Sequence, residues 1–254
     1  MADLPRNPLA KRIIRNYLMD KFAIYIIYAE PRIGKSAYGL KTLGDVYDYL
    51  KGRPLSPALV KDFVGWRPAE VVDRWLKITK RIPAYMWDDA GVWLFSLNWS
   101  DPLLIAIQKY FNLIGTDMNS LILTTPDPRF ILSKILKMPG VNTVKIIRPV
   151  GSETLDNDTI RFSRRAIGYK PYTTPDFKKH GVNTIFEWDF SCKIPQDTYD
   201  YYYPERIKWA GDSKDKIKDL LTSKAKTPSI DSEALKDFND MVESKEPGEV
   251  EFPV

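Results

Sequence analysis

Residues Ala29 to Ser36 combine small, cationic and hydroxyl side chains at the spacing of a phosphate-binding loop. In such a loop successive backbone N–H groups point at a phosphate, and Gly34 permits the close backbone approach that larger residues prevent. Lys35 is predicted to place its charge on the β- and γ-phosphates, and Ser36 to offer its hydroxyl to Mg²⁺. Ala29 stands where the pattern has its first glycine. The change is mild, because that position needs a small residue more than it needs a positive φ. The residues predicted to contact the nucleotide are Glu30, Pro31, Arg32, Ile33, Gly34, Lys35, Ser36 and Ala37.

Two neighbouring carboxylates, Asp88 and Asp89, follow a second apolar stretch. In a protein with a phosphate loop this is the Walker B arrangement. Asp88 is then predicted to hold Mg²⁺ together with Ser36. Asp89 is predicted to orient and polarise the water that attacks the γ-phosphorus. An ordinary Asp-Asp-Ala-Gly turn at a strand end is the alternative, and the presence of the loop favours the catalytic interpretation.

A third apolar stretch ends in two hydroxyls, Thr124 and Thr125. If the acidic strand lies beside this strand, or between it and the loop strand, one of the two hydroxyls would face the γ-phosphate and the water. We predict Thr125 for this catalytic sensor position because it is closer to the strand end. Ordinary β-branched strand residues are the alternative.

Positive charge at the γ-phosphate is a further requirement of hydrolysis, and a neighbouring subunit often supplies it as an arginine finger. Arg32, Arg129 and Arg148 are candidates, although each also fits an ordinary surface arginine. The chain has no Asn-Lys-x-Asp guanine motif, so ATP is expected rather than GTP.

These groups need a fold that gathers the ends of several strands. Short apolar runs alternate with amphipathic helices over residues 21–150, which is an α/β pattern. We expect a three-layer, doubly wound nucleotide-binding core with a mainly parallel five-stranded sheet. The five predicted strands are residues 22–29, 59–64, 82–87, 120–125 and 144–147.

Other segments flank this predicted core. Residues 1–20 are expected to form a basic N-terminal helix, residues 151–223 a β-hairpin followed by a helix, and residues 224–254 an acidic flexible tail. The hairpin is expected to pair residues near 160–163 with residues 186–190. Its connection mixes basic and aromatic residues that could grip a nucleic-acid strand, or simply form an exposed loop: Tyr169, Lys170, Tyr172, Lys178, Lys179 and His180.

Composition fits a globular protein with a basic body. The 254 residues are 44% hydrophobic and carry a net charge of +5. Because residues 228–254 hold eight acids and two bases, residues 1–227 carry +11, which favours a DNA partner. The longest apolar run, eight residues, is too short to span a bilayer. One cysteine and one histidine exclude an internal disulfide and a His-cluster metal site, which fits a reducing cytoplasm.

The strings AEPRIGKSAYGLK, YMWDDAGVWLF and LILTTPDP resemble P-loop ATP-binding proteins of crenarchaeal viruses and conjugative plasmids, the fuselloviral DnaA-like type above all. The resemblance covers about residues 8–215, and the Asp-Asp-x-Gly string is also similar to helicase loaders related to DnaC. It implies an AAA-type, RecA-like ATPase core that works in replication or genome handling. We expect a homo-oligomer in the host archaeal cytoplasm, with a replication or packaging protein as a partner and no membrane association. The chain departs from the AAA pattern in its second Walker B acid, an aspartate instead of glutamate. It also lacks a clear sensor-2 arginine and an initiator-type DNA-binding domain, so origin recognition is not expected.

The function expected from the sequence is therefore a Mg²⁺-dependent ATPase that couples hydrolysis to DNA handling, as in replication initiation or helicase loading. A genome-packaging or DNA-translocating motor with the same core is one alternative. A small-molecule kinase and a non-hydrolysing DNA-binding structural protein are the others.

Overall fold

The computed structural model describes residues 3–95, 102–149, 162–173 and 180–225. The chain divides into two compact units, Met1–Tyr203 and Pro204–Val254. The predicted acidic tail beyond residue 225, and Lys178 and Lys179 of the hairpin connection, lie outside the described residues.

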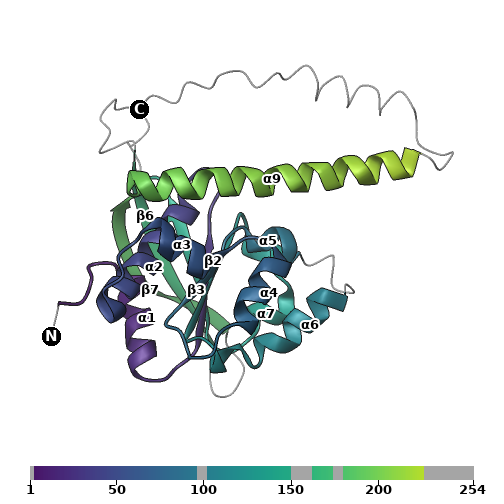
Figure 1. The fold of residues 1–254 in the computed structure, drawn as a ribbon. Helices are drawn as coiled ribbons and strands as arrows, with labels where there is room; N and C mark the ends of the chain where they lie inside the picture. The colour runs from purple at the N-terminus through teal and green to yellow at the C-terminus, as the bar shows by residue number, and fades with distance from the viewer. Residues whose placement is uncertain (1–2, 96–101, 150–161, 174–179, 226–254) are drawn as a thin grey trace. The chain divides into compact units, whose positions relative to one another are not determined.

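The first unit is built on one seven-stranded sheet (Figure 1) in the order β2-β3-β4-β1-β5-β6-β7. The first five strands are parallel, and the last two form an antiparallel hairpin on the β5 edge. The predicted α/β fold with five parallel strands is confirmed, and the hairpin extends the same sheet. The strands are β1 (Ala23–Tyr28), β2 (Val64–Gly65), β3 (Tyr85–Trp87), β4 (Ser120–Thr125), β5 (Val141–Ile147), β6 (Ser163–Thr173) and β7 (His180–Ser191).

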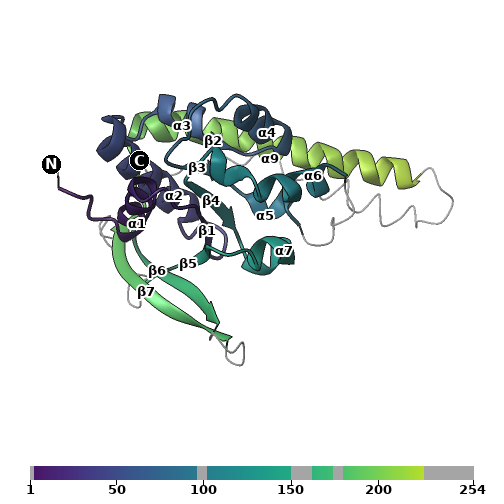
Figure 2. The ribbon, with the colours of Figure 1, turned by 90° about the horizontal axis from the view of Figure 1, so that it is seen from below.

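Helices cover both faces of the parallel part of the sheet, as Figure 2 shows from below. On one face Gly39 of α2 lies against Met86 and Ile27. On the other face Trp75 of α4 and Ile107 of α6 pack with strand residues such as Ile24 and Leu121. The helices are α1 (Pro8–Leu18), α2 (Lys35–Lys51), α3 (Pro57–Phe63), α4 (Pro68–Leu76), α5 (Ala90–Trp93), α6 (Pro102–Phe111), α7 (Ser133–Leu136) and α9 (Gln196–Ala225), with short 3-10 turns at Ile114–Thr116 and Pro128–Phe130.

Strand β1 is the centre of this three-layer arrangement. Successive residues of a strand point to opposite faces, and all but the last residue of β1 are buried. A central parallel strand needs this apolar character on both faces. The turn after β1, which is the predicted phosphate loop, therefore starts from a rigid position at the carboxyl end of the sheet.

The predicted strand at residues 59–64 is wrong over most of its length, because residues 57–63 form helix α3. The Ser56 hydroxyl accepts a hydrogen bond from the N–H of Leu59, and Pro57 takes the first helical position. These are the standard signals for a helix start. Only Val64 and Gly65 pair with β3.

The hairpin strands are longer than predicted. Strand β6 begins at Ser163, the last residue of the predicted range, and runs through Lys170 to Thr173; residues 160 and 161 lie outside the described residues. Tyr169 and Tyr172 thus lie on a paired strand and not in a connecting loop. A Cβ at Gly181 would come within 2.8 Å of the Tyr172 ring, so this glycine provides the space that lets the two strands continue pairing.

Candidate nucleotide-binding site

The predicted phosphate loop connects β1 to α2, and its backbone has the shape that glycine permits. Gly34 immediately precedes α2 with a φ of +107°, and Arg32 has a φ of +63°. A Cβ added to Gly34 would lie 3.0 Å from the Cβ of Cys192. Glycine at position 34 is therefore required both by the backbone conformation and by the close packing of Cys192, which directly follows β7.

Lys35 is held inside this turn. Its side chain is buried, and its Nζ donates hydrogen bonds of 3.0 Å to the backbone carbonyls of Ala29 and Glu30. The ammonium group thus lies on the loop itself, where its charge adds to the positive N-terminal end of α2. Glu30, Pro31 and Arg32 are exposed on the outer side of the loop.

The loop and the acidic strand meet at Asp88. The Ser36 hydroxyl donates to Oδ1 of Asp88 at 2.9 Å, and the Thr124 hydroxyl donates to the same oxygen at 2.6 Å. Asp88 is fully buried. The sheet order explains this meeting, because β4 lies between β1 and β3 and all three strands end at the same edge.

Asp89 is also mostly buried and takes a left-handed backbone conformation, with a φ of +51°. Its N–H donates to the Thr124 hydroxyl at 2.7 Å. A left-handed non-glycine residue is uncommon and costs free energy, and such residues often occur at functional sites. The conformation turns the chain sharply from β3 into α5, directly after the carboxylate of Asp88.

The two threonines at the end of β4 have different partners. Thr124, which precedes the predicted sensor residue Thr125, contacts both acidic residues. The Thr125 hydroxyl donates instead to the carbonyl of Asp127 at 2.9 Å. A Cβ at Gly91 would clash with this hydroxyl oxygen, so Thr125 packs directly against the glycine in α5.

Two residues of the site were not found from the sequence. Arg164, at the start of β6, is buried and donates from Nε to the Ile33 carbonyl at 2.8 Å. Burial lowers the pKa of this guanidinium; nearby Cys192 opposes the shift and Arg148 adds to it. Tyr202, in α9, donates from its hydroxyl to Oδ2 of Asp88. No local pattern marks either residue, because the contacts join positions more than 100 residues apart.

The arginines proposed as fingers have varied surroundings. Arg129 makes a 2.6 Å ion pair with Asp127, and its side chain is 87% exposed. Arg148 is exposed and lies close enough to Arg164 to affect its pKa. Arg32 is exposed at the crest of the loop.

The donor set at the junction fits Mg²⁺. A hydroxyl oxygen of Ser36 and a carboxylate oxygen of Asp88 lie 2.9 Å apart, and hard cations prefer oxygen ligands. Among the described residues no group of three or more His, Cys, Asp or Glu side chains could hold a metal ion. A site with one carboxylate and one hydroxyl suits a Mg²⁺ ion that takes its remaining ligands from phosphates and water.

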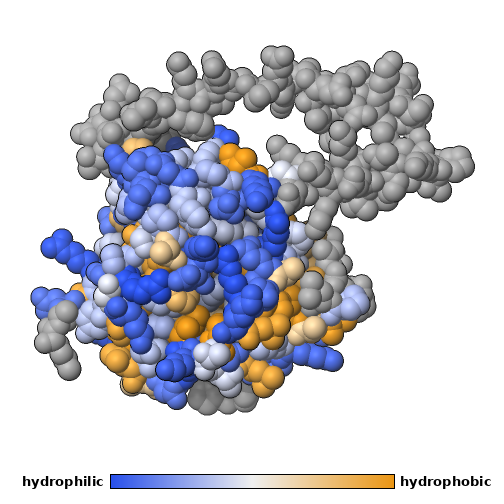
Figure 3. Space-filling view, viewed as in Figure 1, coloured by the Kyte–Doolittle hydropathy of each residue, from blue (hydrophilic) through white to orange (hydrophobic). Residues whose placement is uncertain are grey.

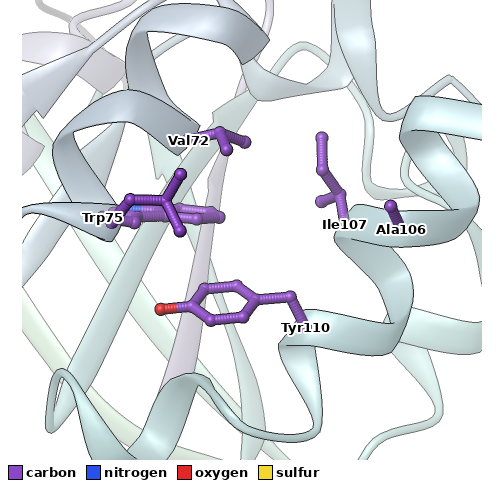
Figure 4. Close-up of a pocket in the computed structure, with 6 residues that line it drawn as sticks. Val72, Trp75, Ala106, Ile107 and Tyr110 are labelled. Carbon is purple, nitrogen blue, oxygen red and sulfur yellow. The ribbon is translucent and has the colours of Figure 1, made fainter.

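A separate apolar cavity of about 180 Å³ lies between α4 and α6 (Figure 4). Apolar side chains also gather at the surface over these two helices (Figure 3). The cavity has almost no polar lining, so it offers no groups for phosphate chemistry. It is lined by Val72, Trp75, Leu76, Ala106, Ile107 and Tyr110.

Among the described residues, no helix is both long enough and apolar enough to cross a membrane.

Comparison with known proteins gives distant similarities. No known protein-family profile matches the chain. It is 24% identical over 240 residues to uncharacterized protein B-251 of Sulfolobus spindle-shape virus 1, covering 89% of this chain and 90% of the viral protein. Among solved structures it is similar to the N-terminal domain of the zonular occludens toxin from Neisseria meningitidis, with a TM-score of 0.39, 10% identity, and coverage of 71% of this chain and 98% of that domain. The viral similarity agrees with the resemblance to archaeal virus proteins.

Proposed function

We propose that this protein is a Mg²⁺-dependent ATPase. The observation that supports it best is the hydrogen-bonded group of Ser36, Asp88 and Thr124, which joins the phosphate loop to the acidic strand. A phosphate-loop motif alone is weaker support, because any turn between a strand and a helix can match it by chance. A buried carboxylate bonded to the first hydroxyl of that helix is a more specific arrangement, because a buried carboxylate needs hydrogen-bond donors and the loop supplies one of them through Ser36.

Binding of the triphosphate follows from the loop. The N–H groups at the start of α2 and the Lys35 ammonium provide positive potential for the phosphates. Mg²⁺, held by Ser36 and Asp88, would neutralise phosphate charge that builds up as the terminal bond breaks. Arg164 would support binding indirectly, because its hydrogen bond to Ile33 fixes the outer side of the loop.

Asp89 is the residue proposed to act on water. A carboxylate can accept a hydrogen bond from a water molecule, orient its oxygen for attack and take up its proton. The left-handed backbone at Asp89 is fixed through the Thr124 hydroxyl. Thr124 therefore holds both acids, and we propose it for the sensor role in place of Thr125.

The finer proposal is that hydrolysis is coupled to DNA handling in an oligomer of this chain. It is supported by the charge of +11 on residues 1–227 and by the exposed Lys170 and Tyr172 toward the far end of β6. A cation next to an exposed aromatic ring can contact phosphate and stack on a base.

An ATPase assay with and without Mg²⁺, single-stranded DNA and duplex DNA tests both the ATPase proposal and the proposed coupling to DNA. We expect phosphate release only with Mg²⁺, stimulation by DNA, and DNA affinity that falls steeply as salt rises. Lys35→Ala should weaken ATP binding by about 100-fold, as expected for the loss of a buried charged partner. The matched control, Lys134→Ala, removes an exposed lysine from α7 and should behave as the wild type.

The outcomes separate the alternatives. Phosphate transfer to a small acceptor without DNA stimulation would favour a kinase. DNA binding without ATP turnover, unaffected by Lys35→Ala, would favour a structural protein. Movement along duplex DNA would favour a packaging motor.

A further inference from the structure

Helix α9 contacts the acidic site through its first turns. Tyr202 is 5% exposed, and its hydroxyl donates to Oδ2 of Asp88. Thr198, one turn earlier on the same face of the helix, is fully buried. Both residues belong to the first unit, which ends at Tyr203. The start of α9 is therefore part of the candidate nucleotide site, although the helix lies more than 100 residues after Asp88 in the sequence.

The Tyr202 ring is held by the sheet edge next to Asp88. It lies against Trp66, with ring centroids 5.8 Å apart. Trp66 directly follows β2, and the preceding residue, Gly65, accepts a 2.9 Å hydrogen bond from the Asp88 N–H. One short segment thus positions the backbone of Asp88 and also supports the ring whose hydroxyl binds its side chain.

Three hydroxyls fix the Asp88 carboxylate from both ends. Ser36 and Thr124 donate to Oδ1, and Tyr202 donates to Oδ2. An aspartate carboxyl turns easily about its last torsion because that torsion has broad minima. With donors on one oxygen alone, the group can tilt away from Ser36. Tyr202 supplies the second point that fixes the plane of the carboxylate.

We propose that Tyr202 is a positioning residue that holds Asp88 in the orientation needed to bind Mg²⁺ with Ser36. Mg²⁺ demands near-ideal geometry from its ligands, so loss of this orientation weakens its binding. Linkage is reciprocal, so Mg²⁺ binding in turn strengthens the docking of the first turns of α9. This inference rests on the proposed Mg²⁺–nucleotide site and adds a structural element that senses its occupancy.

The first experiment measures Mg²⁺ affinity of the ADP-bound protein by calorimetry in Tyr202→Phe, which removes one oxygen and keeps the ring. We expect Mg²⁺ affinity to fall about tenfold, as is typical when a partner of a metal ligand is lost, while ADP affinity without metal stays unchanged. Tyr203→Phe is the matched control, because the Tyr203 ring stacks on Tyr199. Unchanged or tighter Mg²⁺ binding in Tyr202→Phe would overturn the proposal.

A second measurement needs no variant and covers the case in which Tyr202→Phe does not fold. Amide hydrogen exchange of residues 196–203 is compared in the wild type with ADP alone and with ADP plus Mg²⁺. Slower exchange with Mg²⁺ is expected; equal or faster exchange contradicts the linkage.

The two proposals can fail separately. A wild type that binds Mg²⁺–ADP but releases no phosphate from ATP contradicts the ATPase proposal and leaves the role of Tyr202 supported by the affinity data. A wild type that hydrolyses ATP, with Tyr202→Phe equal to it in Mg²⁺ affinity, contradicts only the role of Tyr202.

Discussion

Thr124 donates a 2.6 Å hydrogen bond to the Asp88 carboxylate and accepts a 2.7 Å hydrogen bond from the N–H of Asp89. One hydroxyl therefore fixes the side chain of the first acid and the backbone of the second. The parallel register of β3 and β4 places these residues side by side, since Trp87 lies opposite Leu123 and the next residues along the chain are Asp88 and Thr124.

Replacing Thr124 by valine keeps the shape of the side chain and removes the hydroxyl. We expect Thr124→Val to lower kcat by about 100-fold, because both acids lose a partner, and to destabilise the fold by about 1–3 kcal/mol, because the buried Asp89 N–H loses its acceptor. Thr125→Val, which removes only the bond to the Asp127 carbonyl, should retain most of the activity. Steady-state kinetics and urea unfolding measure both effects. A larger loss of kcat in Thr125→Val would restore the sequence-based choice of Thr125.

Thr124 and Thr125 show which features of the site can be predicted from the sequence and which cannot. Strand β4 and the two hydroxyls at its end could be predicted, because an apolar run that ends in polar residues is a pattern within a few neighbouring residues. Which hydroxyl faces the acids depends on the face to which each residue points, and a shift of one residue along a strand reverses that face. Distance from the strand end, on which the prediction of Thr125 rests, does not carry this information, and the structure shows that Thr124 contacts the acids.

Asp89→Asn tests the proposed role of this carboxylate in activating water. The amide has nearly the same size but is neutral and a poor base. We expect ATP affinity within about twofold of the wild type and kcat lowered by about 10²–10⁴-fold, the usual contribution of a general base. Nucleotide titration and single-turnover phosphate release separate the two quantities. Retention of full turnover would exclude Asp89 from the chemical step.

Arg164→Lys tests whether the guanidinium fixes the phosphate loop. Lysine keeps the charge but has no Nε–H to donate to the Ile33 carbonyl. We expect ATP affinity to fall about tenfold, as for one hydrogen bond from a charged donor. The neighbouring Arg165→Lys is the control, because Arg165 is partly exposed and pairs with Asp189 at 2.7 Å. Equal affinities in the two variants would remove Arg164 from the site.

Long-range contacts account for most of what the sequence did not predict. Arg164 and Tyr202 reach the site because the hairpin joins the β5 edge and α9 follows it, and neither placement has a local signature. The error at residues 59–64 had a different origin. An apolar run of this length fits a strand or a helix equally well, and the Ser56-Pro57 helix start decided between them.

Gly34→Ala separates the two reasons for glycine in the loop. An alanine at a φ of +107° is strained by about 1–2 kcal/mol, and its Cβ would also meet the Cβ of Cys192 at 3.0 Å. We expect weaker ATP binding and lower stability, measured by nucleotide titration and urea unfolding. In the double variant Gly34→Ala/Cys192→Gly the side-chain contact is gone but the backbone strain remains, so only part of the loss should be recovered relative to Cys192→Gly alone. Complete recovery would mean that packing against Cys192, and not the backbone conformation, requires glycine at position 34.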